Sequence, residues 1–242
     1  MNRRDLLRST MGAATATAVM SVVGPATVHA ATAAGRRRAG TLRTRILLYD
    51  GAEELDSIGP AEVFDIAREY FGADLAVDYV TLGEPRVVPL NRGGRLAVTG
   101  RWDPAGTDLV VVPGGGWRDP SAPGTHREIA SGAIPRALAG SRDGTRIFAS
   151  VCVGALLLSA AGFLDGRPCT THALAREKLA GEGGVLKSAR VVDDGDVLTA
   201  GGVSSGLDLA LWLLEREFGP DLAVATERIL EYERRGAVWR AA

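Results

Sequence analysis

An α/β fold built on an open, largely parallel sheet is the fold class that this sequence predicts, on three observations. From residue 43 onward, short apolar runs alternate with segments whose apolar residues recur at helical spacing. Residues 108–112 form a run with four consecutive apolar positions, which is typical of a strand covered on both faces of a sheet. The 242 residues are 46% apolar and 24% charged, which fits one soluble domain. Helices are therefore expected on both faces.

The first half of this domain contains three predicted strands, which are the apolar runs 45–49, 75–82 and 108–112. Residues 60–70 keep apolar positions at helical spacing and begin with Pro60, whose fixed φ suits a first helical turn. Residues 85–98 are predicted to form a hairpin or another excursion from the sheet. A loop over 113–117 leads into a helix over 125–138.

The second half continues the alternation. Residues 145–151 predict a buried strand, 154–161 a helix of small residues, 167–171 a short strand and 174–180 a helix. The runs 189–192 and 196–199 flank Asp-Asp-Gly and predict a small hairpin. Two closing helices are expected over 205–218 and 220–234.

The first 34 residues predict an export signal. Arg3 and Arg4 resemble a twin-arginine motif, an Ala-rich apolar run follows, and Val28-His-Ala30 fits a small-residue cleavage site. The alternative, an uncleaved membrane anchor, is disfavoured because the apolar run 11–23 is shorter than the ~20 residues that span a bilayer. We therefore expect a signal over 1–34, a basic linker over 35–42 and a domain over 43–242. The protein would be exported to the periplasm or beyond, and it would meet a membrane only during export.

Charge and residue counts exclude several functions. Residues 1–40 hold six arginines and one aspartate, so a net charge of −1 for the whole chain leaves −6 for the remainder. An acidic domain argues against nucleic-acid binding. The only cysteines, Cys152 and Cys169, have sixteen residues between them and match no common zinc spacing, so neither a metal nor another cofactor is expected. A disulfide between them remains open in an exported protein.

Cys152 is the candidate nucleophile. Ser150-x-Cys152-x-Gly154 lies between a predicted strand and a predicted helix, and it has the pattern of a nucleophile elbow, in which small neighbours make room for a sharp turn. A helix N-terminus beside the thiol is expected to lower its pKa from about 8.5. The alternative is a buried cysteine that fills a gap in the core, and the elbow pattern argues against it.

Two other loops follow predicted strands and are expected at the same edge of the sheet. The backbone N–H groups of Gly115 and Gly116, with that of Val153, can form an oxyanion hole. Asp56 lies near the start of a predicted helix. From the residues alone, it is equally well an N-cap or a carboxyl group beside the thiol.

His172 and Gly154 are expected to line the pocket. Nothing in the sequence directs the His172 ring toward the thiol, so a pocket or structural role is preferred to that of a general base. The glycine-rich turn 199–209 has no phosphate-binding lysine after it and is expected to pack closely or line the pocket.

Four ordered segments, 51–56, 112–115, 150–155 and 170–172, resemble the DJ-1/PfpI superfamily. The segments 55–64, 154–166 and 201–212 are most similar to isonitrile hydratases. The resemblance implies a flavodoxin-like three-layer sandwich of the glutamine amidotransferase-like type and a homodimer. It also implies that Cys152 is the nucleophile and Asp56 its acidic partner.

One residue departs from the isonitrile hydratase pattern: Val153 stands where those enzymes have threonine. The same residue excludes the adjacent Cys-His pair of PfpI-like proteases. Segment 201–212 also resembles regulators that carry this domain ahead of a DNA-binding module. An export signal and an end at residue 242 argue against that class.

The leading hypothesis is a hydratase that converts a small isonitrile substrate to an N-substituted formamide. The Cys152 thiolate would attack the terminal carbon while Asp56 supplies a proton, and the same carboxylate would activate water to hydrolyse the thioimidate. One alternative is a cysteine hydrolase of an ester, amide or reactive carbonyl compound. Another is a non-catalytic redox sensor or binding protein whose Cys152 is oxidised or joined to Cys169.

Overall fold

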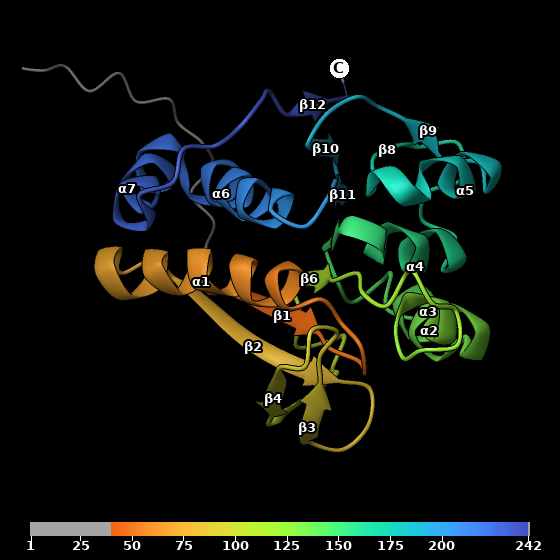
Figure 1. The fold of residues 1–242 in the computed structure, drawn as a ribbon. Helices are drawn as coiled ribbons and strands as arrows, with labels where there is room; N and C mark the ends of the chain where they lie inside the picture. The colour runs from red at the N-terminus through yellow and green to blue at the C-terminus, as the bar shows by residue number, and fades with distance from the viewer. Residues whose placement is uncertain (1–39, 242) are drawn as a thin grey trace, which may run out of the picture. The chain divides into compact units, whose positions relative to one another are not determined.

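A central eight-stranded sheet organises residues 40–241, the part of the chain that this computed structural model describes (Figure 1). The predicted signal over 1–34 and residues 35–39 of the predicted linker lie outside the described residues. The strand order is β12-β10-β11-β7-β6-β1-β2-β5, and every neighbouring pair is parallel except β10 and β11. The bounds are β1 Leu42–Leu47, β2 Leu75–Thr81, β5 Gly100–Arg101, β6 Leu109–Val112, β7 Ile147–Val151, β10 Val191–Asp194, β11 Val197–Ala200 and β12 Trp239–Arg240.

Helices cover both faces of the sheet, as the sequence predicts. Helices α1, α6 and α7 pack against one another, and α2, α3 and α4 pack against one another separately (Figure 1). The connection from β1 to β2 and the connection from β6 to β7 run in opposite directions along the sheet. Because crossovers between parallel strands are right-handed, the two groups of helices lie on opposite faces. Their bounds are α1 Glu54–Phe71, α2 Thr125–Ser131, α3 Ala133–Ala139, α4 Ala155–Ala160, α5 Arg176–Gly181, α6 Ser205–Phe218 and α7 Pro220–Leu230.

Two small sheets lie outside the main one. Strands β3 (Arg86–Pro89) and β4 (Arg95–Val98) form the hairpin that the sequence allows over 85–98. Strands β8 (Pro168–Cys169) and β9 (Val185–Leu186) pair with each other, so the strand predicted over 167–171 exists but does not join the main sheet. The predicted hairpin around Asp-Asp-Gly is confirmed as the antiparallel pair β10 and β11.

Three predicted helices differ from the structure by more than two residues or are divided. Helix α1 begins at Glu54, six residues before Pro60, which therefore lies inside the helix. Proline there has no N–H for the carbonyl of Asp56. Its ring packs closely on α6, where a Cβ at Gly206 would lie 3.3 Å from the Pro60 ring. Gly132, at φ 68°, divides the predicted helix 125–138 into α2 and α3, and α7 ends at Leu230 rather than at 234.

The buried core lies under the carboxyl ends of the strands that carry the predicted site. Every residue of β6 and β7 is buried, and the glycine loop and Cys152 follow directly after them. No helix among residues 40–241 is both long enough and apolar enough to cross a membrane.

Candidate active site

Cys152 occupies a sharp turn between β7 and α4, in the one-turn 3₁₀ helix Cys152–Gly154. Its φ is 59°, which is uncommon for a residue other than glycine. The N–H of Cys152 donates to the Gly201 carbonyl at 2.8 Å, and the Thr171 hydroxyl donates to the Cys152 carbonyl at 2.8 Å. These bonds fix the strained backbone. This is the elbow that the sequence predicts.

Gly154 explains why the elbow requires a small residue. A Cβ there would lie only 2.2 Å from the Val112 carbonyl oxygen, at the end of β6. Gly154 therefore permits close approach of the turn to the neighbouring strand, and it is not among the residues that line the cavity. Its predicted place in the pocket lining is wrong, because it packs against the backbone at the end of β6.

Asp56 lies in the first turn of α1 and is fully buried. Its Oδ2 accepts the N–H of Gly114 at 3.0 Å, whereas Oδ1 makes no hydrogen bond of ordinary geometry within the described residues. Burial and the charge of Glu53 raise the pKa of Asp56 to about 7, against the lowering effects of the Gly114 N–H and the Cys152 thiol. The N-cap of α1 is Glu53, so the capping alternative for Asp56 is wrong and the carboxyl faces the thiol.

The thiol of Cys152 is not acidified. Burial, followed by the charge of Asp56, raises its pKa to about 12, although the N–H groups of Val153 and Val203 hydrogen bond to the sulfur. The expected lowering by a helix N-terminus is therefore wrong. The turn at Cys152 leads into a helix of only six residues, and its dipole is outweighed by desolvation and by a neighbouring carboxylate. At neutral pH the proton is on sulfur and Asp56 is the base beside it.

A cavity of about 370 Å³ opens above Cys152. Of the predicted site residues, Cys152, Val153, Gly115, Gly116 and His172 line it, while the buried Asp56 lies behind the thiol. Val203 also lines it, as the sequence allows for the glycine-rich turn 199–209. The other lining residues are not singled out by the sequence, and they come from the residue before α1, the β3–β4 loop, the loop after β6 and the turn after β8. They are Glu53, Asn91, Arg92, Trp117, Arg118, Asp119, Ala122 and Leu174.

Gly115 and Gly116 line this cavity with backbone atoms alone. The φ of Gly115 is 144°, and a Cβ there would lie 2.1 Å from the Gly51 carbonyl oxygen. The φ of Gly116 is 54°, and a Cβ there would lie 2.2 Å from the Pro123 carbonyl oxygen, so both positions require glycine. Neither N–H donates a hydrogen bond to another residue between 40 and 241. Both are thus available to a ligand, whereas the N–H of Val153 is already directed at the sulfur.

His172 lines the cavity but does not act on the thiol in this arrangement. Its Nδ1 accepts the N–H of Leu174 at 3.2 Å, which places the proton of the neutral ring on Nε2. The other histidine of the domain, His126, stacks on Trp117 at a ring separation of 3.9 Å. Each histidine therefore has a structural contact.

Neither cysteine forms a disulfide. Cys152 and Cys169 are both free, and Cys169 is fully buried in β8. The disulfide that the sequence left open is absent from the structure. Among residues 40–241 no group of three or more His, Cys, Asp or Glu side chains is arranged to hold a metal ion.

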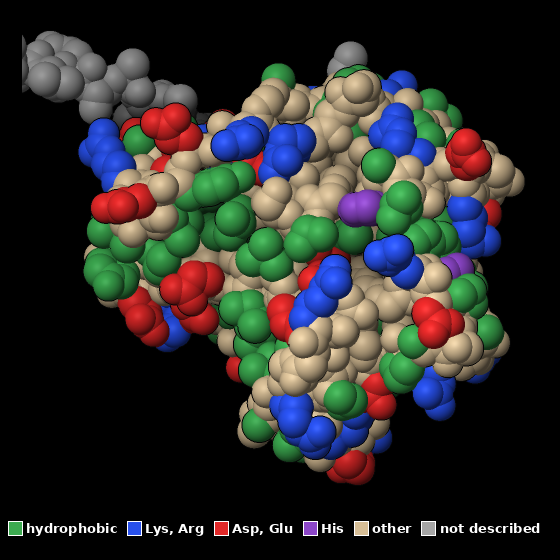
Figure 2. Space-filling view, viewed as in Figure 1, with side chains coloured by type: hydrophobic (Ala, Val, Ile, Leu, Met, Phe, Trp, Pro, Cys, Tyr) green, Lys and Arg blue, Asp and Glu red, His purple; other side chains and the backbone are tan. Residues whose placement is uncertain are grey.

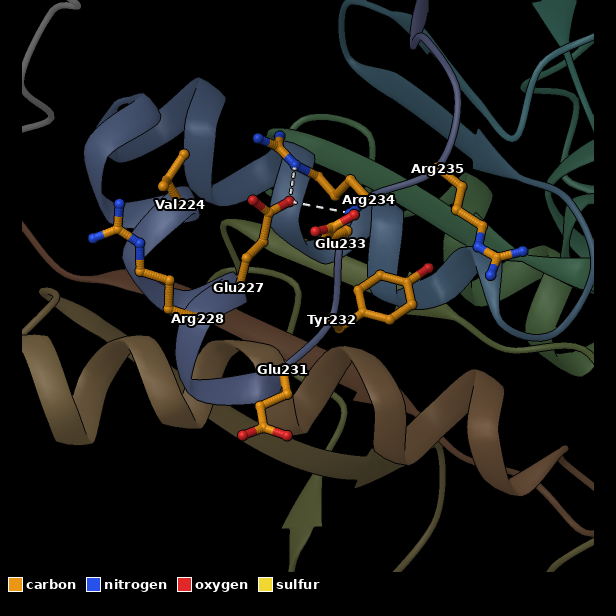
Figure 3. A pocket seen from close by; sticks show the side chains of 8 residues that line it. All are labelled: Val224, Glu227, Arg228, Glu231, Tyr232, Glu233, Arg234 and Arg235. Atoms are coloured by element: carbon orange, nitrogen blue, oxygen red, sulfur yellow. Dashed lines mark hydrogen bonds and ion pairs between the residues drawn. The ribbon is translucent and has the colours of Figure 1, made fainter. Parts of the chain in front are cut away.

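Another hollow lies away from the two cysteines. It has a volume of about 690 Å³ and lies between α7 and the segment after it, where Glu227 and Arg234 form an ion pair (Figure 3). No cysteine, serine or histidine lines it. Acidic and basic side chains are interspersed on the face shown in Figure 2, without a broad basic field.

Comparison with known proteins finds relatives that match most of this chain. The chain is 32% identical over 194 residues to an isonitrile hydratase from Pseudomonas putida, covering 79% of this chain and 78% of that protein. It is 28% identical to the Parkinson disease protein 7 homolog of Danio rerio, covering 75% and 92%. A ThiJ/PfpI family protein from Pseudomonas syringae superposes with a TM-score of 0.71 at 25% identity, covering 90% and 84%.

The sequence pattern of the DJ-1/PfpI family matches residues 43–216, which include the elbow, the glycine loop and Asp56. The chain therefore belongs to the DJ-1/PfpI family.

Proposed function

We propose that this protein is a cysteine-dependent hydratase that converts an isonitrile to an N-substituted formamide. The observation that carries the proposal is the Cys152 thiol at the base of a cavity with the buried Asp56 carboxyl directly behind it. Similarity to an isonitrile hydratase over most of both chains supports the substrate class.

The first half of the reaction adds the thiol across the terminal isonitrile carbon. Asp56 accepts the proton of Cys152 as the sulfur–carbon bond forms, and then delivers that proton to the same carbon, giving the thioimidate R–N=CH–S–Cys152. A carboxyl group with a pKa of about 7 suits both transfers at neutral pH, since it can hold or release a proton there. Concerted transfer also avoids a free thiolate, which burial disfavours.

The second half adds water to the thioimidate carbon. Water loses a proton to a carboxylate base, nitrogen gains one, and the tetrahedral intermediate expels the Cys152 sulfur, which recovers its proton. The product is R–NH–CHO, so the net reaction consumes one isonitrile and one water. The free N–H groups of Gly115 and Gly116 orient the water or stabilise the developing negative charge on its oxygen.

Turnover of an isonitrile panel by wild type and Cys152→Ala tests the proposal. Wild-type protein should release the formamide, and Cys152→Ala should lose this activity to background. Cys169→Ala is the matched control, because it removes a buried thiol that does not line the cavity. Equal activity in Cys152→Ala and wild type would refute the mechanism.

A cysteine hydrolase is the second candidate, favoured by one observation. The unpaired N–H groups of Gly115 and Gly116 are suited to an oxyanion formed from an ester, amide or reactive carbonyl carbon. Assay of the same three proteins on esters and amides separates the two functions. Turnover of those substrates without isonitrile turnover would favour the hydrolase.

We further propose that the protein is exported and forms a homodimer. The export proposal depends on the Arg3-Arg4 pattern and the cleavage pattern at Val28-His-Ala30. Replacement of both arginines by lysine should retain the protein inside the producing cell. Sedimentation of the purified domain tests the dimer.

A further inference from the structure

The Glu53 carboxylate lines the cavity, whereas the Asp56 carboxylate does not. Glu53 immediately precedes α1 and lines the cavity together with Cys152. Asp56, three residues later, is fully buried and is absent from the lining. A water molecule that approaches a group attached to the sulfur from the cavity therefore meets Glu53 first.

The Glu53 side chain is held in place by the loop between β3 and β4. Asn91 Nδ2 donates to Oε2 at 2.6 Å, and Arg92 Nε donates to Oε1 at 3.2 Å. The loop itself is anchored by the Asn91 N–H, which donates to the Ala52 carbonyl at 2.9 Å. Although Glu53 is the N-cap of α1, its side chain makes no capping bond. A carboxylate has about four acceptor sites, so two remain for water.

We propose that Glu53 is the base that activates water in the second half of the reaction, while Asp56 serves the first half. The proposal rests on the hydratase function given above. Water donates one proton to the Glu53 carboxylate as its oxygen bonds to the thioimidate carbon. Glu53 passes this proton to the nitrogen. When the carbon–sulfur bond breaks, Glu53 relays the proton of the new hydroxyl group to the departing sulfur, so it ends each cycle ionised.

The position of Glu53 fits this division of labour. Its charge raises the pKa of both Asp56 and Cys152, so it opposes the formation of a thiolate. A carboxylate there therefore hinders the first half of the reaction. In the second half the sulfur carries a neutral thioimidate, and a nearby carboxylate helps by accepting a proton from water. Arg92, whose side chain is 71% exposed, offsets only part of the charge.

The test compares Glu53→Gln with Asp56→Asn and with a matched control, Glu54→Gln. Glu54 is the adjacent acid; it accepts the Arg92 N–H at 2.8 Å on the same loop but does not line the cavity. Each protein is mixed with excess cyclohexyl isocyanide and quenched at intervals, and its intact mass is measured by mass spectrometry. Formamide release is followed in parallel.

Glu53→Gln should accumulate an adduct on Cys152 with the mass of one isonitrile, and its formamide release should fall on the order of 10²-fold. Asp56→Asn should form no adduct, and Glu54→Gln should turn over as wild type does. Added acetate should restore formamide release in Glu53→Ala, which a purely structural role for Glu53 would not permit.

Turnover by Glu53→Gln at the wild-type rate without an adduct would overturn the inference and leave the hydratase function intact. Loss of both adduct and turnover in Glu53→Gln, with no acetate rescue of Glu53→Ala, would also overturn it. Absence of formamide and of adduct in wild type would instead refute the hydratase function itself.

Discussion

Replacement of Asp56 by asparagine should make the protein more stable at neutral and alkaline pH. Asparagine has the shape of a protonated aspartate, and its side-chain oxygen can keep the hydrogen bond from the Gly114 N–H. It cannot ionise, however, so the variant avoids the free-energy cost of a buried charge that wild type incurs as pH rises.

The magnitude follows from the pKa of Asp56, which burial raises from 3.8 to about 7. A raised carboxyl pKa contributes stability that is fully present below the unfolded value and is lost as pH rises through the folded value. Each unit corresponds to about 1.4 kcal/mol, so the wild-type free energy of unfolding should fall relative to Asp56→Asn by about 4 kcal/mol between about pH 4 and pH 7. Above that range the Asp56 contribution is constant.

Urea unfolding of both proteins from about pH 4.5 to 8.5 measures this difference. Other titrating groups are common to the two proteins and cancel. Glu62→Gln is the control, because Glu62 is an exposed carboxyl on the same helix and its removal should change stability little at any pH. A difference between wild type and Asp56→Asn that does not change with pH would refute the assignment of Asp56 as a buried acid that ionises near neutrality.

Three other changes are testable. Gly154→Ala should lower the free energy of unfolding by roughly 1–3 kcal/mol, because the new Cβ would lie 2.2 Å from the Val112 oxygen; an unchanged thermal midpoint would contradict this. The rate at which iodoacetamide alkylates Cys152 should rise about tenfold per pH unit from roughly pH 7 to 10, because the pKa of the thiol is raised to about 12. The Asp56→Asn variant should react faster than wild type at each pH. A plateau of the wild-type rate near pH 8 would show that the thiol is acidic. Val153→Thr should lower the free energy of unfolding by about 1–3 kcal/mol, because residue 153 is 1% exposed and the new hydroxyl would be buried. Chemical denaturation measures this loss. Equal stability of the variant and wild type would mean that the hydroxyl has a hydrogen-bond partner.

The fold was largely predictable because its long elements carry clear periodicity. Helix α6 begins and ends where the sequence places it, at Ser205 and Phe218. The start of α1 was missed because proline is usually a first-turn residue, and nothing local shows that Pro60 packs against Gly206 from the other end of the chain. Strands of two residues, such as β5 and β9, are too short to produce a periodic signal.

The candidate site was predictable only where a motif is local. The elbow around Cys152 and the glycines after β6 are each contained in a few consecutive residues. Glu53 and its partners Asn91 and Arg92 are almost forty residues apart in sequence and meet through a hairpin, so no spacing rule identifies them. Two adjacent acids, Glu53 and Glu54, stand at the start of α1, and the sequence does not show which of them faces the cavity. The thiol pKa was misjudged because the dipole argument omits burial, which depends on the complete fold.

The elbow also has a consequence for the folding pathway. The groups around Cys152 come from opposite sides of strand β7: Asp56, whose carboxyl faces the thiol, follows β1, and the Gly201 carbonyl, which accepts the Cys152 N–H, follows β11. Contacts of such large sequence separation form late, because the entropy of closing long chain segments must be overcome first. Cys152 should therefore become sheltered only when β11 docks beside β7. Pulsed thiol labelling during refolding would time that final assembly of the sheet, with the thiol as a natural probe.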